Sequence, residues 1–278
     1  MTDRFIPIAV STGSLYPLPT LESIRRLNEL GIQDIELTLQ PNEFFITFER
    51  TLSMAILPEL LDYVQNSGLS VRSIHAPMMR AERCYNLWSR LKYLAHSIEV
   101  CRLLGGQVVV IHPFHLFRTH EEALGYLAND GVSLHSSLLP GTKDLLDQAG
   151  AANIILALEN IQDWQDEPFF NAPQNMLRFL NELNHDSLRF TFDLMHAKVS
   201  GTLDGFTNSL PTHIVNIHAS DLLPPIRRVA VGKGVIDWER LVPKFQTWTH
   251  LRQITVELSN PRENEIVESV RFFDKAAS

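Results

Sequence analysis

The strongest constraint on the fold is a series of short, almost uninterrupted apolar segments that recur along the whole chain. They are rich in Val, Ile and Leu, and many follow a Gly, Asn or Asp. Continuous apolarity, rather than alternation with polar residues, is typical of strands that are buried on both faces, as in parallel sheets. The predicted strands are Phe5–Val10, Asp34–Leu39, Val71–His75, Gln107–His112, Asn153–Glu159, Arg189–Asp193, His213–His218 and Arg252–Glu257.

Amphipathic segments with helix start and stop signals separate these strands. Thr20–Leu30, for example, begins at a Thr that can cap a helix and is followed by Gly31. Glu121–Ala149 contains glycines and predicts an interrupted helix or two short ones, whereas the region Ala197–Ser209 specifies its helix poorly. The other predicted helices are Met54–Asn66, Asn86–Leu104, Pro173–Leu183, Trp238–Trp248 and Asn264–Phe273.

Strand and helix therefore alternate eight times in a chain of 278 residues. This pattern predicts an α/β fold, a (β/α)₈ barrel that forms a single domain over residues 1–278, with an open doubly wound sheet as the main alternative. The first strand is followed by STGSLYP and not by GxGxxG, which disfavours a dinucleotide-binding fold. The stretches Gln40–Leu52 and Ala219–Ile236 are longer than usual strand-to-helix loops, and such loops lie on the functional face of a barrel.

Six consecutive predicted strands, the third to the eighth, end in a His, Glu or Asp. Since the chain holds 32 acidic residues and 11 histidines among 278, six such coincidences are improbable. In a barrel the carboxyl ends of the strands converge on one mouth, where the active sites of this architecture lie. The six residues are His75, His112, Glu159, Asp193, His218 and Glu257.

Several carboxylates buried together are costly unless a cation compensates their charge. We therefore expect Glu159, Asp193, His218 and Glu257 to bind one divalent ion, namely Mn²⁺, Mg²⁺, Co²⁺ or Zn²⁺, and a structural ion-pair network is the alternative. His75 and His112 are either hydrogen-bonded core histidines or part of the site, where they could hold a second ion. His196 could simply cap the next helix, and Glu36 could reach the pocket or pair with Arg or Lys.

At these residues the chain resembles the xylose-isomerase-like TIM-barrel superfamily, which includes sugar isomerases and epimerases, inosose-processing enzymes and barrel-type apurinic-site endonucleases. The resemblance covers nearly the whole chain, and its order and spacing are more specific than any single motif. It is carried by GIQDIELTL, SIHAPM, VVVIHPF, LALEN, FDLMHA, NIHASD, VGKGVIDW and VEL.

The resemblance to the epimerase branch implies one divalent ion bound by Glu159, Asp193, His218 and Glu257, with the two glutamates also serving as acid and base. It also implies that His196 and Arg228 contact substrate oxygens, and we expect His75 and His112 to face the same substrate. A metal that holds adjacent carbonyl and hydroxyl oxygens would acidify the carbon between them and stabilise the resulting enediolate. Glu159 and Glu257 could then remove and return a proton on opposite faces of that carbon.

The expected function is accordingly a metal-dependent isomerase or epimerase of a sugar, sugar phosphate or polyol. The same residues could support dehydration of a cyclic polyol, and a barrel that only binds metal or sugar is a third alternative. The similar endonucleases use three zinc ions, with His75, His112 and Glu159 matching one of the sites. Their third site needs an Asp-x-His after the seventh strand, where this chain has Ile226, Arg227 and Arg228, which disfavours phosphodiester cleavage.

Charge and composition bear on the partners and the compartment. The formal net charge of −8 disfavours general duplex-DNA binding. The sequence contains no run of about 18 apolar residues, so it predicts no membrane span. Cys84 and Cys101 lie far from any CxxC spacing and predict reduced thiols. The N-terminus does not resemble a secretory signal, and the two observations together favour the cytoplasm. We expect a small sugar or polyol as the partner, and assembly into a homo-oligomer is compatible with the sequence.

Overall fold

Eight parallel strands form a closed barrel in the computed structural model, which describes residues 6–46, 51–52, 55–77, 87–118, 120–128, 131–161 and 170–276. The barrel closes where β1 pairs with β12, with Ile8 opposite Ile254 and Val10 opposite Val256. The predicted (β/α)₈ architecture is thus confirmed. The strands in chain order are β1 (Ile8–Ser11), β2 (Asp34–Thr38), β5 (Ser70–His75), β6 (Val108–Ile111), β7 (Ile155–Glu159), β8 (Leu188–Asp193), β9 (Ile214–Ala219) and β12 (Gln253–Val256).

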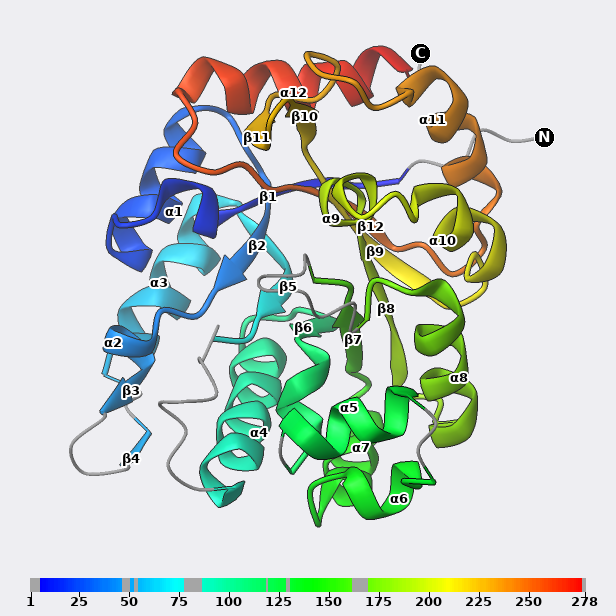
Figure 1. Ribbon diagram of the computed structural model, residues 1–278. Helices are drawn as coiled ribbons and strands as arrows, with labels where there is room; N and C mark the ends of the chain where they lie inside the picture. The colour runs from blue at the N-terminus through cyan, green and yellow to red at the C-terminus, as the bar shows by residue number, and fades with distance from the viewer. Residues whose placement is uncertain are drawn as a thin grey trace.

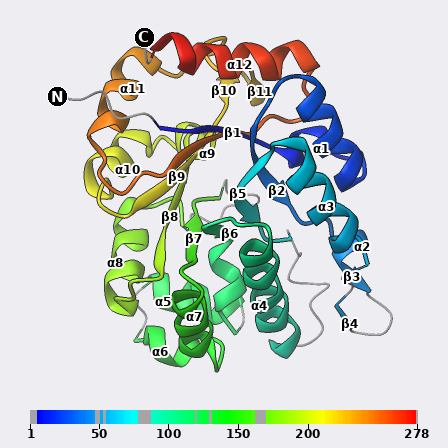
Figure 2. The same ribbon diagram turned by 180° about the vertical axis from the view of Figure 1, so that it is seen from behind.

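Helices surround this barrel, as the opposite views in Figures 1 and 2 show. The predicted interrupted helix is confirmed, because the chain forms α5, α6 and α7 with Gly131 and Gly141 at positive φ between them. The poorly specified region Ala197–Ser209 overlaps the end of one short helix, α9 (Leu194–Val199), and contains a second, α10 (Leu203–Ser209). The helices are α1 (Thr20–Glu29), α2 (Pro41–Phe44), α3 (Leu57–Ser67), α4 (Leu87–Leu103), α5 (His120–Ala128), α6 (Leu134–Ser137), α7 (Thr142–Ala151), α8 (Pro173–Leu183), α9 (Leu194–Val199), α10 (Leu203–Ser209), α11 (Trp238–Thr247) and α12 (Glu263–Ala276).

Both stretches that were expected to be loops also contain short antiparallel strands. Gln40–Leu52 includes α2, β3 (Phe45–Ile46) and β4 (Thr51–Leu52), and Ala219–Ile236 includes β10 (Asp221–Leu223) and β11 (Arg227–Val229). Strands of two or three residues are too short to show a period in the sequence, which is why the pattern did not reveal them.

Apolar side chains fill the space between strands and helices and one side of the barrel interior. Val109 and Ile111 belong to the main core, whereas Val108 and Val110 of the same strand form a separate apolar cluster with Ala157. Since side chains alternate along a strand, this second cluster lines the barrel interior. The interior facing β2, β5, β9 and β12 is instead polar, with hydrogen bonds that cross the lumen.

Two further expectations concern the cysteines and membranes. Cys101 is fully buried in α4, and Cys84 lies outside the described residues. Among the helices that the structure describes, none is both long and apolar enough to span a bilayer.

Candidate metal centre and active site

The barrel brings all six strand-end residues to one mouth. Parallel strands in register place their carboxyl ends at the same level, so side chains far apart in sequence converge there. His218 is the fifth residue of β9, and its neighbour in β8 is Asp193, to which it is registered directly. His75, Glu159 and Asp193 are the last residues of their strands, and His112 and Glu257 each follow a strand by one position.

Four of these residues form a compact group of possible metal ligands. Glu159, Asp193, His218 and Glu257 each offer one ligand atom, and these atoms all lie within 4.8 Å of one another. His218 Nδ1 lies 3.0 Å from Glu159 Oε1 and 3.6 Å from Glu257 Oε2. Glu159, Asp193 and His218 are buried, whereas the side chain of Glu257 is 21% exposed and so is the ligand most open to an incoming molecule.

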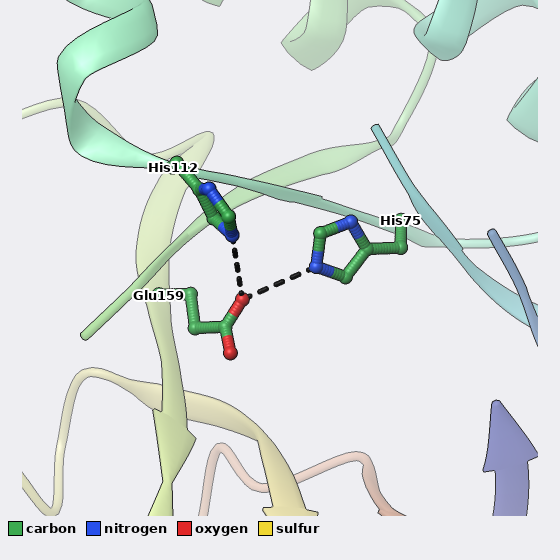
Figure 3. A group of neighbouring side chains, drawn as sticks. All are labelled: His75, His112 and Glu159. Carbon is green, nitrogen blue, oxygen red and sulfur yellow. Dashed lines mark hydrogen bonds and ion pairs between the residues drawn. The ribbon is translucent and has the colours of Figure 1, made fainter. Parts of the chain in front are cut away.

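A second group shares Glu159 with the first. Figure 3 shows the rings of His75 and His112 pointing at the Glu159 carboxylate, and each Nε2 lies 3.2 Å from Oε2. His75 Nδ1 is 2.8 Å from the carbonyl oxygen of Ala76, to which it can donate, so Nε2 either donates to Glu159 in the protonated ring or, once deprotonated, could bind an ion. Because Glu159 directs Oε1 to His218 and Oε2 to the histidine pair, it bridges both groups.

Arg228 places a permanent positive charge in the mouth. It lies on β11, and its guanidinium donates 2.6 Å to Glu257 Oε2 and 2.8 Å to Asp193 Oδ2. The β10–β11 hairpin is held by the buried Asp221 carboxylate, which accepts from the backbone N–H groups of Leu222 and Ile236 and from the ring of Trp238. The loop after the seventh barrel strand therefore carries its arginine on a fixed support.

His196 lies between Arg228 and the end of β7. Asp193 caps α9 by accepting from the His196 backbone N–H at 2.7 Å, so the capping role that the sequence left open is performed by Asp193. His196 Nδ1 is 2.8 Å from the carbonyl oxygen of Asn160, and Nε2 is 3.0 Å from Arg228 Nη2. If Nδ1 donates to that carbonyl, Nε2 accepts from the arginine.

The charges in the mouth shift the pKa values of the buried groups. Burial opposes ionisation of Glu257, but the charges of Arg228 and His218 outweigh it and lower its pKa to about 2. Burial likewise works against the charged forms of His75 and His218, yet the neighbouring carboxylates raise the pKa of His75 to about 9 and that of His218 well above its usual value. For Glu159, the charge of His218 and hydrogen bonds from three histidines overcome burial and hold its pKa well below the usual range.

The donor set fits a divalent cation. Three carboxylates and an imidazole are the ligands that hard or borderline ions such as Mg²⁺, Mn²⁺ and Zn²⁺ take in proteins. Two of these carboxylates bond Arg228, and the third, Glu159, contacts the rings of His75 and His218. A dication at the four-ligand group would therefore compensate charge that lies in a mostly buried site.

Sequence reasoning left Glu36 unassigned and missed Asn160. Asn160 is fully buried and bonds the backbone of Asp193 twice, accepting from its N–H at 2.8 Å and donating to its carbonyl at 2.9 Å. Glu36 is fully buried beneath His218. A single carboxylate inside the apolar segment IELTL was the signal for Glu36, and no comparable signal marked Asn160.

Comparison with known families agrees with this architecture. The family model described as xylose isomerase-like TIM barrel matches residues 24–276. The chain belongs to this family. The resemblance expected from the strand-end motifs is thereby confirmed.

The individual proteins that the chain resembles are distant in sequence, but the matches cover nearly the whole chain. An uncharacterised protein of Mycobacterium tuberculosis is 22% identical over 297 residues, covering 96% of each chain. The crystal structure of a D-tagatose 3-epimerase-like protein has a TM-score of 0.72 and 18% identity, and the match covers 97% of this chain and 96% of that one. The crystal structure of the IolI protein with a bound zinc atom has a TM-score of 0.70 and 18% sequence identity. That match covers 98% of both chains.

Proposed function

We propose that this protein is a divalent-metal-dependent isomerase or epimerase that acts on a sugar or polyol carrying a carbonyl group. The observation that carries the proposal is the four-ligand group of Glu159, Asp193, His218 and Glu257 with Arg228 beside it. The solved structures with this fold include an epimerase-like protein and a zinc-binding protein, which supports the same class of site.

The proposed reaction moves a proton at the carbon next to the carbonyl. A dication at the four ligands would polarise the carbonyl and the neighbouring hydroxyl and so acidify that carbon. Glu159 and Glu257 reach the site from β7 and the end of β12, which are not adjacent strands of the barrel. They can therefore face a substrate from two directions, and we assign proton removal and return to this pair.

Arg228 would tune Glu257 as well as bind substrate. Its hydrogen bond and charge keep Glu257 ionised and weakly basic, with a pKa of about 2. If the guanidinium transfers its hydrogen bond to a substrate oxygen, Glu257 becomes a stronger base at the moment when a proton is to be removed. His196, His75 and His112 surround the same mouth, and we assign them to contacts with substrate hydroxyls.

The test combines metal content with isotope exchange. The protein is stripped with chelator and reloaded with Mn²⁺, Mg²⁺, Co²⁺ or Zn²⁺, and ketoses are then incubated with it in D₂O. We expect deuterium at a single carbon with the loaded wild type, and a loss of at least about 100-fold with Glu257→Gln, in which a general acid or base is removed. Exchange that is independent of added metal, or is unchanged in this variant, would contradict the proposal.

Two other reactions are kept as alternatives. Dehydration of a cyclic polyol would begin with the same proton removal, and its product, which has lost water, is distinguished by mass. The group of His75, His112 and Glu159 favours a zinc-dependent hydrolase of the apurinic-site endonuclease type, because a second ion there would share Glu159 with the first. Two or more zinc ions per chain, together with cleavage of DNA containing abasic sites, would favour this hydrolase over the isomerase.

A further inference from the structure

Glu36 is a fully buried carboxylate at the centre of β2, and the mechanism above does not use it. Its side chain crosses the barrel interior to contact Asn216 of β9, on a strand that is not its neighbour in the barrel. In the part of the chain that the structure describes, no lysine or arginine forms an ion pair with it. A buried carboxylate needs donors or a charge to compensate its desolvation, so its contacts should disclose its role.

Three side chains surround Glu36. Ser73 Oγ lies 2.7 Å from Oε2, and Asn216 Nδ2 lies 3.1 Å from the same oxygen. His218 Nε2 lies 3.1 Å from Oε1 and 3.4 Å from Oε2. The carboxylate therefore lies against the ring nitrogen of His218 that is opposite the proposed ion-binding nitrogen, Nδ1.

The direction of these hydrogen bonds is fixed by the amide of Gln253, which can only donate through its Nε2. It donates to Ser73 Oγ at 2.7 Å and to Thr255 Oγ1 at 2.9 Å. Ser73 consequently directs its own proton to Glu36. Thr255 directs its proton to Asn216 Oδ1 at 3.0 Å, which turns the amide nitrogen of Asn216 towards Glu36. Two series of hydrogen bonds thus begin at the Gln253 amide and end on the Glu36 carboxylate, which acts only as an acceptor.

An acceptor at this place determines how His218 can bind an ion. With Glu36 accepting, Nε2 of His218 keeps its proton, so an ion can replace only the proton on Nδ1, and the lone pair left there points at the group of Glu159, Asp193 and Glu257. We propose that Glu36 is a positioning residue that fixes the ring orientation and tautomer of His218 and thereby raises the affinity of the site for a divalent ion. This inference rests on the proposed metal centre, and it adds a residue from the second barrel strand to it.

The first experiment compares ion affinity in two variants with the same chemical change. Glu36→Gln keeps the size of the side chain but replaces one acceptor oxygen by an NH₂ group, which must then face Ser73, Asn216 or His218. The control is Glu43→Gln, because Glu43 follows the same strand and bonds the backbone N–H of Thr20 at 3.1 Å rather than any proposed metal ligand. We expect Mn²⁺ affinity, measured by calorimetry on folded protein, to fall roughly 10–100-fold in Glu36→Gln and to stay within about twofold in the control.

The second experiment needs no change at Glu36, and so it does not depend on the folding of that variant. Wild-type protein labelled with ¹⁵N-histidine is loaded with ¹¹³Cd²⁺, and the His218 signals are assigned by their loss in His218→Asn. We expect cadmium coupling at Nδ1 and a bound proton at Nε2. Coupling at Nε2, or Mn²⁺ affinity unchanged in a folded Glu36→Gln, overturns the role of Glu36. Failure of the wild type to bind Mn²⁺ or Cd²⁺ overturns the metal centre itself.

Discussion

Arg228 neutralises two carboxylates that are also proposed metal ligands. Its guanidinium bonds Asp193 and Glu257 at 2.8 and 2.6 Å, and its side chain is only 11% exposed. A dication at the four-ligand group would be repelled by this charge, while a substrate oxygen would be attracted by it. One residue therefore opposes ion binding and favours substrate binding.

We predict that Arg228→Gln separates these two effects. Removal of the cation should leave Mn²⁺ affinity unchanged or raise it severalfold, whereas turnover of an accepted ketose should fall at least about tenfold because the substrate oxygen loses a charged partner. Calorimetry and steady-state kinetics measure the two quantities. Arg227→Gln, which changes the exposed neighbour on β11, should alter neither. Loss of the ion from Arg228→Gln would contradict this assignment.

Cys101 gives a second prediction for a single residue. Burial raises the pKa of its thiol to about 12, and since the thiolate is the reactive form, little of it exists at pH 8. In a Cys84→Ser variant the one remaining thiol should react with a disulfide reagent at pH 8 only after denaturant is added. Rapid labelling of the native variant would show that α4 opens, contrary to the packed position of this residue.

Among the structural elements, the β10–β11 hairpin connects stability to the site. The buried Asp221 carboxylate accepts N–H groups from Leu222, Gly232, Ile236 and Trp238 at 2.8 to 3.2 Å. The loop approaches so closely that a Cβ at Gly234 would overlap Asp221 Oδ1 and the carbonyl oxygen of Leu222. The hairpin is therefore organised around one side chain.

We predict that Asp221→Ala lowers the free energy of unfolding by about 3 kcal/mol, since buried donors lose a charged acceptor. Turnover should fall with it, because Arg228 stands on this hairpin. Urea denaturation measures the loss of stability, and Asp237→Ala, which removes the N-cap of α11, is expected to cost only about 1 kcal/mol. Equal costs for the two variants would argue against a special role for Asp221.

The regular elements could be predicted from the sequence, and the hairpins could not. Buried parallel strands are encoded locally as continuous apolar runs, so β2 and β5 were placed to within one residue. The strands β10 and β11 pair over three residues only, and their stability comes from Asp221 rather than from a repeating pattern. The strand-end residues were visible because each ends a recognisable strand, whereas partners such as Asn160 act through contacts between strands that no local pattern records.

For the whole molecule, protons and a dication compete for the same buried groups. The pKa of His75 is raised to about 9 and that of His218 is raised well above 6.5, chiefly by carboxylates that outweigh burial. A raised pKa means that the stabilising charge is fully present below the unfolded value near 6.5 and is lost as the pH rises through the folded value. Metal ligands, by contrast, must be deprotonated to bind.

We therefore predict opposite pH dependences for the metal-free and metal-loaded protein. Between pH 6.5 and 9 the metal-free protein should lose stability, by up to about 3 kcal/mol from a shift of the size found for His75. Over the same range Mn²⁺ affinity should rise, so the gap between the melting temperatures with chelator and with Mn²⁺ should widen. Thermal unfolding at each pH measures the melting temperature with chelator and with Mn²⁺. A difference between the two that stays constant with pH would contradict proton–metal competition.

The placement of Arg228 has a consequence for how members of such a family diversify. All four proposed ligands belong to barrel strands or follow them directly, while the arginine stands on a separate hairpin after β9. Substitutions on β10 and β11 that keep Asp221 can thus change what the mouth accepts while the four proposed ligands stay in place. An engineer who wishes to redirect the protein to another carbohydrate should graft new hairpins there and keep the strand termini untouched.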